Sequence, residues 1–172
     1  MFDLQAFKDN REAKRTAGEE WFISASDALA AYQAGERDLS GANLHGANLY
    51  KANLSGADLR ETCLDPDAPM LPLPDDFPFM PDSDGFFVAY RTKTSRYVGN
   101  TIYEADKEYT APYFSVDTNT ECHPGLYFTT LDRLDTTEYA GFPRIVVRVH
   151  ITDVVCAGDK FRCKKFFVVQ DM

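Results

Sequence analysis

Leucine recurs at every fifth position in one segment of this 172-residue chain, at residues 39, 44, 49, 54, 59 and 64. In four of these units an alanine stands two positions before the leucine, followed three times by asparagine and once by aspartate. A period of five fits neither the helical period of 3.6 residues nor the two-residue period of a strand. The pattern predicts a square solenoid, with leucine and alanine inside, Asn or Asp outside near the corners, and glycines in the turns.

The repeat resembles the pentapeptide-repeat family. Its motif, A(D/N)LXX, is matched by Ala42-Asn43-Leu44, Ala47-Asn48-Leu49, Ala52-Asn53-Leu54 and Ala57-Asp58-Leu59. The resemblance implies a short right-handed β-helix over residues 37–64, in which about four units close one coil. Such a short solenoid needs caps, because neighbouring turns bury each other's faces.

The N-terminal segment, residues 1–36, is predicted to be a helical arm that caps the first coil. The Ser24-Ala25-Ser26-Asp27 run offers N-cap side chains, residues 28–34 favour a helix, and Gly35 ends it. A cap with no other role is the favoured interpretation.

Residues 65–85 form an acidic, proline-rich connection that contains six of the nine prolines and six acidic residues but no basic one. Proline excludes a helix or an interior strand here. Its apolar side chains are too many for a solvated linker, so we expect the segment to lie as a strap on one folded body. The alternative is a docking peptide displayed to a partner.

Residues 86–172 have the composition of a β-rich domain. Strands are predicted over residues 86–92, 125–130, 144–151 and 161–169, with one helix over 131–140. The predicted fold class is therefore α+β: a helix-capped pentapeptide coil followed by a mixed, mostly antiparallel domain with one helix.

Charge and composition narrow the function classes. The formal charge of −9 lies entirely in residues 1–36 and 65–85, whereas residues 37–64 and 86–172 are each neutral. A nucleic-acid partner needs a basic patch, and a DNA-mimicking inhibitor needs a long acidic rod, so neither is expected. No membrane span or signal peptide is predicted, and four scattered cysteines do not suggest a secreted disulfide framework.

The C-terminal half carries a second resemblance. Residues 107–139, with Cys122, Pro124-Gly125, Tyr127-Phe128 and Tyr139, are similar to an uncharacterised domain that follows pentapeptide repeats in bacteriophage and giant-virus proteins. This resemblance implies a viral context, in the host cytoplasm or the virion, and it implies no reaction.

Two sets of residues offer chemistry as alternatives. Cys122, His123, Cys156 and Cys163 are zinc-type ligands, but six residues separate the last two cysteines whereas paired zinc ligands usually stand about two to four apart. Buried thiols are the favoured interpretation, and no metal or other cofactor is predicted. Separately, Arg91, Tyr127 and Glu138 faintly resemble the ADP-ribosyltransferase pattern, which implies NAD binding; core aromatic side chains and a solvated glutamate are the simpler explanation.

The sequence therefore favours a non-catalytic protein–protein interaction or assembly protein of a bacteriophage or prophage. An inhibitor of a host or defence protein is the first alternative, and the NAD-dependent transferase is the second. The partner is another copy of the chain, which would give a homo-oligomer, or a different protein. Exposed coil residues expected to make the contact are His45, Tyr50, Lys51 and Arg60.

Overall fold

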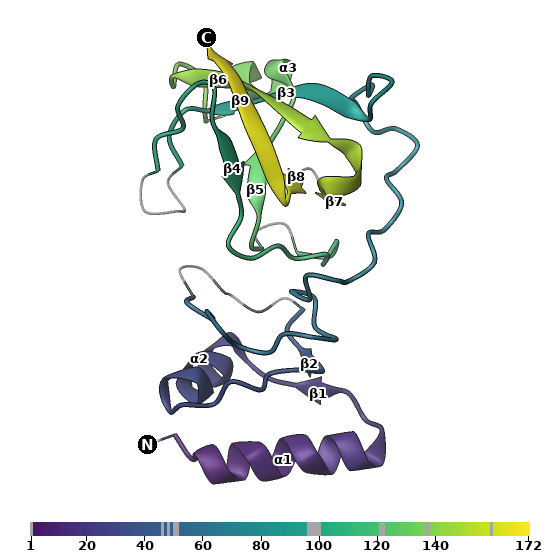
Figure 1. Cartoon of the computed structure of the whole chain (residues 1–172), viewed down its shortest axis with the longest axis vertical. Helices are drawn as coiled ribbons and strands as arrows, with labels where there is room; N and C mark the ends of the chain where they lie inside the picture. The colour runs from purple at the N-terminus through teal and green to yellow at the C-terminus, as the bar shows by residue number, and fades with distance from the viewer. Residues whose placement is uncertain are drawn as a thin grey trace. The chain divides into compact units, whose positions relative to one another are not determined.

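The computed structural model describes residues 2–45, 47, 49, 52–95, 101–120, 123–136, 138–158 and 160–172. The chain divides into two compact units, Met1–Pro69 and Met70–Met172, so the division falls inside the predicted strap. Figure 1 shows the helices and strands of both units, which are described separately below. No helix among the described residues is long and apolar enough to cross a lipid bilayer.

The first unit begins with two helices and two short strands. In chain order these are α1 (Leu4–Ala17), β1 (Trp21–Phe22), α2 (Ala25–Gln33) and β2 (Ala42–Asn43). The Ser24 side chain accepts a hydrogen bond from the Asp27 backbone N–H, which caps α2. The predicted helix is confirmed, although it begins at Ala25, three residues earlier than expected.

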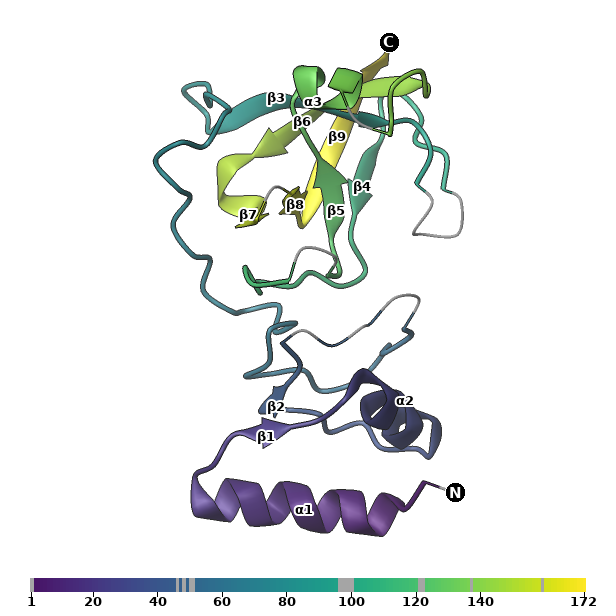
Figure 2. The ribbon, with the colours of Figure 1, turned by 180° about the vertical axis from the view of Figure 1, so that it is seen from behind.

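Helix α1 is a second N-terminal element that the sequence analysis did not separate from the arm. In both views α1 lies against β1, on the side away from β2, and β1 pairs in parallel with β2 (Figures 1 and 2). The buried Phe7 ring of α1 meets the buried Trp21 ring edge-on, with 5.0 Å between centroids. Apolar packing therefore fixes the helix on the strand pair.

The start of the repeat is fixed to α1 by a charged network around Glu36, which is 7% exposed. Its Oε1 accepts hydrogen bonds from the backbone N–H groups of Arg37 and Asp38, and its Oε2 lies 3.4 Å from Arg11 Nη1 and 3.5 Å from Lys8 Nζ. Burial alone would raise the pKa of Glu36, but these hydrogen bonds and cations outweigh it and lower that pKa.

The repeat turns a corner after five of its six leucines. Each leucine carbonyl from Leu39 to Leu59 accepts a hydrogen bond from the backbone N–H three residues later, at 2.9–3.2 Å, as in a β-turn. The chain returns beside itself after four units: Asp38 and Asp58 form a parallel bridge, and the Leu39 N–H donates to the Asp58 carbonyl at 3.0 Å. All six leucines are at most 8% exposed, which confirms that they lie inside.

The second unit is α+β and rich in strands, as predicted. Its elements are β3 (Phe86–Thr92), β4 (Glu108–Thr110), β5 (Leu126–Phe128), α3 (Leu131–Thr136), β6 (Arg144–His150), the short 3₁₀ helix η1 (Ile151–Asp153), β7 (Val154–Ala157), β8 (Lys160–Cys163) and β9 (Lys165–Asp171). They form a four-stranded sheet in the order β3-β6-β9-β4 and a three-stranded sheet in the order β5-β8-β7. Every pairing within these two sheets is antiparallel.

One predicted strand is wrong. Residues 161–169 do not run as a single strand, because the chain bends at Lys164 and passes from β8 in one sheet to β9 in the other. Backbone hydrogen bonds hold the corner: the Lys164 N–H donates to the Asp153 carbonyl, and the Lys164 carbonyl accepts from Ala111. The expected helix over 131–140 is also shorter, ending at Thr136.

A shared core fills the space between the two sheets. Val147, Val149 and Val168 of the larger sheet and Cys163 of the smaller one are essentially inaccessible. The strap reaches this core, because its Phe79 is 8% exposed and belongs to the same cluster.

Candidate interaction surface

In the repeat units that the structure describes, the Asn or Asp holds the corner that follows it. Asn53 Oδ1 accepts a hydrogen bond from the Ser55 backbone N–H at 3.0 Å, and Asp58 Oδ1 accepts one from the Arg60 backbone N–H at 3.2 Å. These are Asx turns, in which a short polar side chain replaces a backbone hydrogen bond. The motif's polar position is therefore structural, and the residues after each leucine are left to form the outer surface.

Two of the four predicted contact residues can be placed. His45 is exposed, and its backbone N–H donates to Asn43 Oδ1. Arg60 is exposed as well, with 73% of its side chain accessible. Tyr50 and Lys51 lie outside the described residues.

Arg60 is held by its own unit. Its Nε lies 2.9 Å from Asp58 Oδ1 and its Nη2 lies 2.5 Å from Asp58 Oδ2, which is a bidentate pair. The hydrogen bond to Asp58 and the charge of that carboxylate raise the pKa of Arg60. The guanidinium is thus fixed in direction while one face stays open to solvent.

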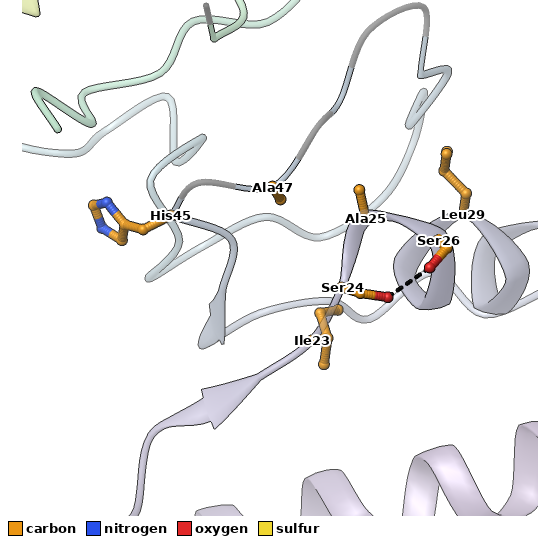
Figure 3. Close-up of a pocket in the computed structure, with 7 residues that line it drawn as sticks. All are labelled: Ile23, Ser24, Ala25, Ser26, Leu29, His45 and Ala47. Atoms are coloured by element: carbon orange, nitrogen blue, oxygen red, sulfur yellow. Dashed lines mark hydrogen bonds between the residues drawn. The ribbon is translucent and has the colours of Figure 1, made fainter. Parts of the chain in front are cut away.

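His45 borders an open cavity of about 560 Å³ at the start of α2. Its lining comprises Ile23, Ser24, Ala25, Ser26, Leu29, His45 and Ala47 (Figure 3). Figure 3 shows the His45 ring turned away from the two serines, whose hydroxyls are 2.7 Å apart. Apolar carbon with a few hydroxyls suits a side chain of another protein, whereas catalysis needs convergent ionisable groups.

Arg60 borders a smaller, polar cavity of about 240 Å³, together with Arg15, Ser40 and Glu61. Glu61 occupies the repeat position of Gly41 and Gly56 and shares their left-handed backbone, with φ of 61°. A residue with a side chain is strained there, so the corner geometry is imposed by the repeat.

Arg15, which lines the same cavity, binds the Asp38 side chain. The two side chains form a forked contact at 3.2 and 3.3 Å, and Asp38 Oδ1 also accepts from the Ser40 hydroxyl at 2.7 Å. Burial would raise the pKa of Asp38, but the bonds from Ser40 and Arg15 and the charge of Arg11 lower it to about 2. The carboxylate is therefore ionised at neutral pH.

The zinc-type residues do not form a metal site in the part of the chain that the structure describes. No group of three or more His, Cys, Asp or Glu side chains lies close enough there to hold an ion, and Cys122 falls outside those residues. Burial raises the pKa of Cys163 strongly and, followed by the charge of Asp76, raises that of Cys156 to about 11. Without a metal ion beside them, both cysteines are protonated thiols at neutral pH.

The three transferase-type residues differ in burial, and Arg91 is the buried one. Arg91 is 8% exposed on the core side of β3, with its guanidinium 3.9 Å from the centre of the Tyr103 ring. Burial lowers its pKa, and Tyr103 partly opposes that effect. Glu138 is exposed, and the Tyr127 hydroxyl donates to the His123 carbonyl at 2.5 Å. A buried guanidinium is not accessible to a dinucleotide phosphate, so this geometry gives the transferase no support.

The sequence analysis missed a buried polar cluster in the second unit. His123 Nδ1 lies 2.7 Å from Ser115 Oγ and 3.9 Å from Asp117 Oδ2, and all three residues are at most 3% exposed. Both neighbours face the same ring nitrogen, whereas a catalytic triad uses both nitrogens of its histidine. The fully buried Arg162 donates to the carbonyls of Ser115 at 3.0 Å and Thr120 at 2.8 Å.

We interpret this cluster as structural, because its described members are buried and hold the loop between β4 and β5. The signal for it in the sequence was weak. Arg162 alternates with Phe161 and Cys163 in an apolar strand, and a charge in such a place is usually taken for the solvent side.

Comparison with known proteins supports the repeat. Residues 36–65 match the family model described as pentapeptide repeats (8 copies). This segment is a pentapeptide repeat. The match covers the leucines, the Asx corners and both His45 and Arg60, and it leaves the C-terminal unit unmatched. No curated protein and no solved structure matches the chain.

Proposed function

We propose that this chain is a non-catalytic protein–protein interaction or assembly protein that makes contact through the outer surface of its pentapeptide repeat. One observation carries the proposal. The repeat places its leucines inside and fixes its corners with Asx side chains, so the remaining positions, including His45 and Arg60, stand on a rigid surface beside open cavities. A preorganised surface loses little conformational entropy when it binds.

The finer architecture is part of the same proposal: residues 37–64 form a short right-handed β-helix. The parallel bridge between Asp38 and Asp58 and the hydrogen bonds that accompany it support this, as do the β-turns after the leucines. Hydrogen exchange tests it. The Leu39, Gly41 and Asp58 amides should exchange slowly, and fast exchange at all three would contradict the coil.

The setting we propose is a bacteriophage or prophage, with the protein in the host cytoplasm or the virion. It is supported by the resemblance of residues 107–139 to the domain that follows pentapeptide repeats in viral proteins. The partner is then a second copy in an assembly or a different protein, such as a host factor that the chain inhibits.

Light scattering tests the assembly form of the proposal. The mass of the native chain should rise with concentration over a hundredfold range, and a variant with His45→Glu and Arg60→Glu should stay lighter at every concentration. Both side chains are exposed and the Arg60–Asp58 pair lies at the surface, so the changes should cost little stability, which the Tm of the variant checks. A native chain that is monomeric throughout would contradict self-assembly and leave a different protein as the partner.

Thermal unfolding with NAD tests the non-catalytic part. We expect no change in Tm at millimolar NAD, because Arg91 is buried whereas Glu138 is exposed. A Tm that rises with NAD concentration would overturn this part in favour of the transferase.

A further inference from the structure

The strap that follows Met70 has two different sides. Leu73, Phe77 and Phe79 point to the core of the second unit, where Phe79 stacks on Phe87 with 4.8 Å between centroids. Phe77 meets both Phe87 and Phe161 edge-on, at 5.4 and 5.8 Å. These contacts fix an otherwise irregular segment on the folded body, so it is not a flexible linker.

The other side faces solvent. Met80 is 91% exposed and Leu71 is 50% exposed, and the strap's prolines after Met70 are exposed too. We call this set the outer row: Leu71, Pro72, Pro74, Pro78, Met80 and Pro81. The outer row stays exposed after folding, while the phenylalanines of the same segment anchor it to the core. An exposed apolar segment that is anchored in this way is typical of a sequence that another protein recognises.

Acidic side chains accompany the outer row along the strap. Residues 65–85 contain six acidic side chains and no basic one. Asp82 is used within the unit, since it accepts from the backbone of Phe86 and pairs with Arg148 at 2.9 Å. Asp75 and Asp76 are exposed at the turn between the two halves of the row, where the Phe77 N–H donates to the Pro74 carbonyl.

We propose that the outer row is a docking surface for a protein domain with a basic, aromatic-lined groove, of the kind that accepts proline-rich segments. Proline rings and a methionine side chain pack on aromatic walls, and Lys or Arg at the groove rim complements Asp75 and Asp76. The phenylalanine anchors order the strap before binding, so less entropy is lost on association than for a free peptide. The outer row belongs to the second unit, and this proposal does not depend on the function proposed for the repeat.

Binding to purified domains of the proline-recognising classes tests the proposal. The probes are SH3, WW and EVH1 domains, each class represented by one member with a basic groove rim and one with an acidic rim. Titration calorimetry with the full chain should show binding to basic-rim members and none to acidic-rim members. Their affinity should fall as salt is raised, because the rim charges are exposed. No binding by any basic-rim member, or binding regardless of rim charge, would overturn the proposal.

Matched variants assign the surface. Met80→Ser with Leu71→Ser should weaken binding by roughly tenfold or more, as truncation of central apolar contacts does. Asp75→Asn with Asp76→Asn should weaken it less and flatten its salt dependence. Met172→Ser is the control, since Met172 is 57% exposed and lies outside the strap.

Failure here is distinguishable from failure of the proposed function. The His45→Glu and Arg60→Glu variant should bind the basic-rim domains as the native chain does, since those residues belong to the repeat. Equal loss of binding in that variant and in the Met80 and Leu71 variant would contradict a strap surface.

Discussion

The repeat and the C-terminal domain place their polar side chains in opposite ways. In the repeat the interior is leucine with small neighbours, and His45 and Arg60 remain outside. In the C-terminal domain Arg162 and Asp117 are fully buried and serve the fold. A polar group is available for binding only where the fold does not already use it, and in this chain such groups lie on the repeat and on the strap.

The largest expected effect tests whether the buried polar cluster is structural. Arg162→Ala leaves the Ser115 and Thr120 carbonyls without their buried donor, and should cost about 3–5 kcal/mol of unfolding free energy. Chemical denaturation of the full chain, followed by hydrogen exchange in residues 113–120, measures it. Arg148→Ala is the control, because this arginine pairs with Asp82 at the surface and should change stability by less than about 1 kcal/mol. Equal losses of stability in the two variants would show that the buried arginine contributes no more to the fold than the exposed one.

A smaller loss is expected from the repeat interior. Leu54 is 1% exposed, and Leu54→Ala should destabilise the first unit by about 2–4 kcal/mol through lost burial and a cavity. The readout is hydrogen exchange at the Leu39 and Asp58 amides, which should become faster. Ser55→Ala, next to it on the outer surface, should change little. A tolerant Leu54 would show that the repeat does not depend on a tightly packed interior.

Acid should weaken the first unit through Asp38. Its folded pKa of about 2 lies below its ordinary value of 3.8, so the ionised carboxylate contributes stability that is present above about pH 4 and is lost as the pH falls toward 2. Asp38→Asn should lower the Tm at pH 6 and remove part of the acid dependence between pH 4 and 2. Asp27→Asn, at the exposed start of α2, is the comparison. An unchanged pH profile in the Asp38 variant would contradict the role of its contacts with Arg15 and Ser40.

The smallest effect concerns the strained corner. Glu61→Gly places glycine where the repeat imposes a left-handed backbone, and should stabilise the chain by roughly 0.5–1 kcal/mol. Glu61→Ala separates backbone strain from the loss of the carboxylate, because alanine keeps the strain. A Tm measured for both variants should therefore rise for glycine alone. A similar rise for alanine would assign the effect to charge.

The structure of the repeat was easier to predict from the sequence than the structure of the C-terminal domain. The repeat and its inward leucines followed from the period of five, since one position in five has the same environment. The strands β3 and β6 followed from β-branched and aromatic runs. The break at Lys164 was missed because apolar residues stand on both sides of the Lys164-Lys165 pair, which suggested one continuous strand. The sheet changes there, and the buried positions shift from Cys163 to Phe166.

Tertiary context decided the candidate sites. Spacing made the cysteines an unusual ligand set, and an incomplete residue pattern weakened the transferase interpretation of Arg91. The burial of Cys163 and Arg91 depends on the packing of two sheets that no local pattern describes. The cluster around Arg162 joins a strand to a loop more than forty residues earlier. Short-range periodicity carries no information on such pairs.

The return of Asp38 beside Asp58 gives this segment a fixed unit of growth. Inserting four further repeat units, twenty residues in all, would keep the leucines and the corners in register with the parallel bridge, whereas an insertion not divisible by five would shift the leucines out of their inward position. Duplication in sets of four units could therefore lengthen the repeat without any change in the residues that fill its interior. In the proposed β-helix, the increment of growth is therefore twenty residues, the spacing between Asp38 and Asp58.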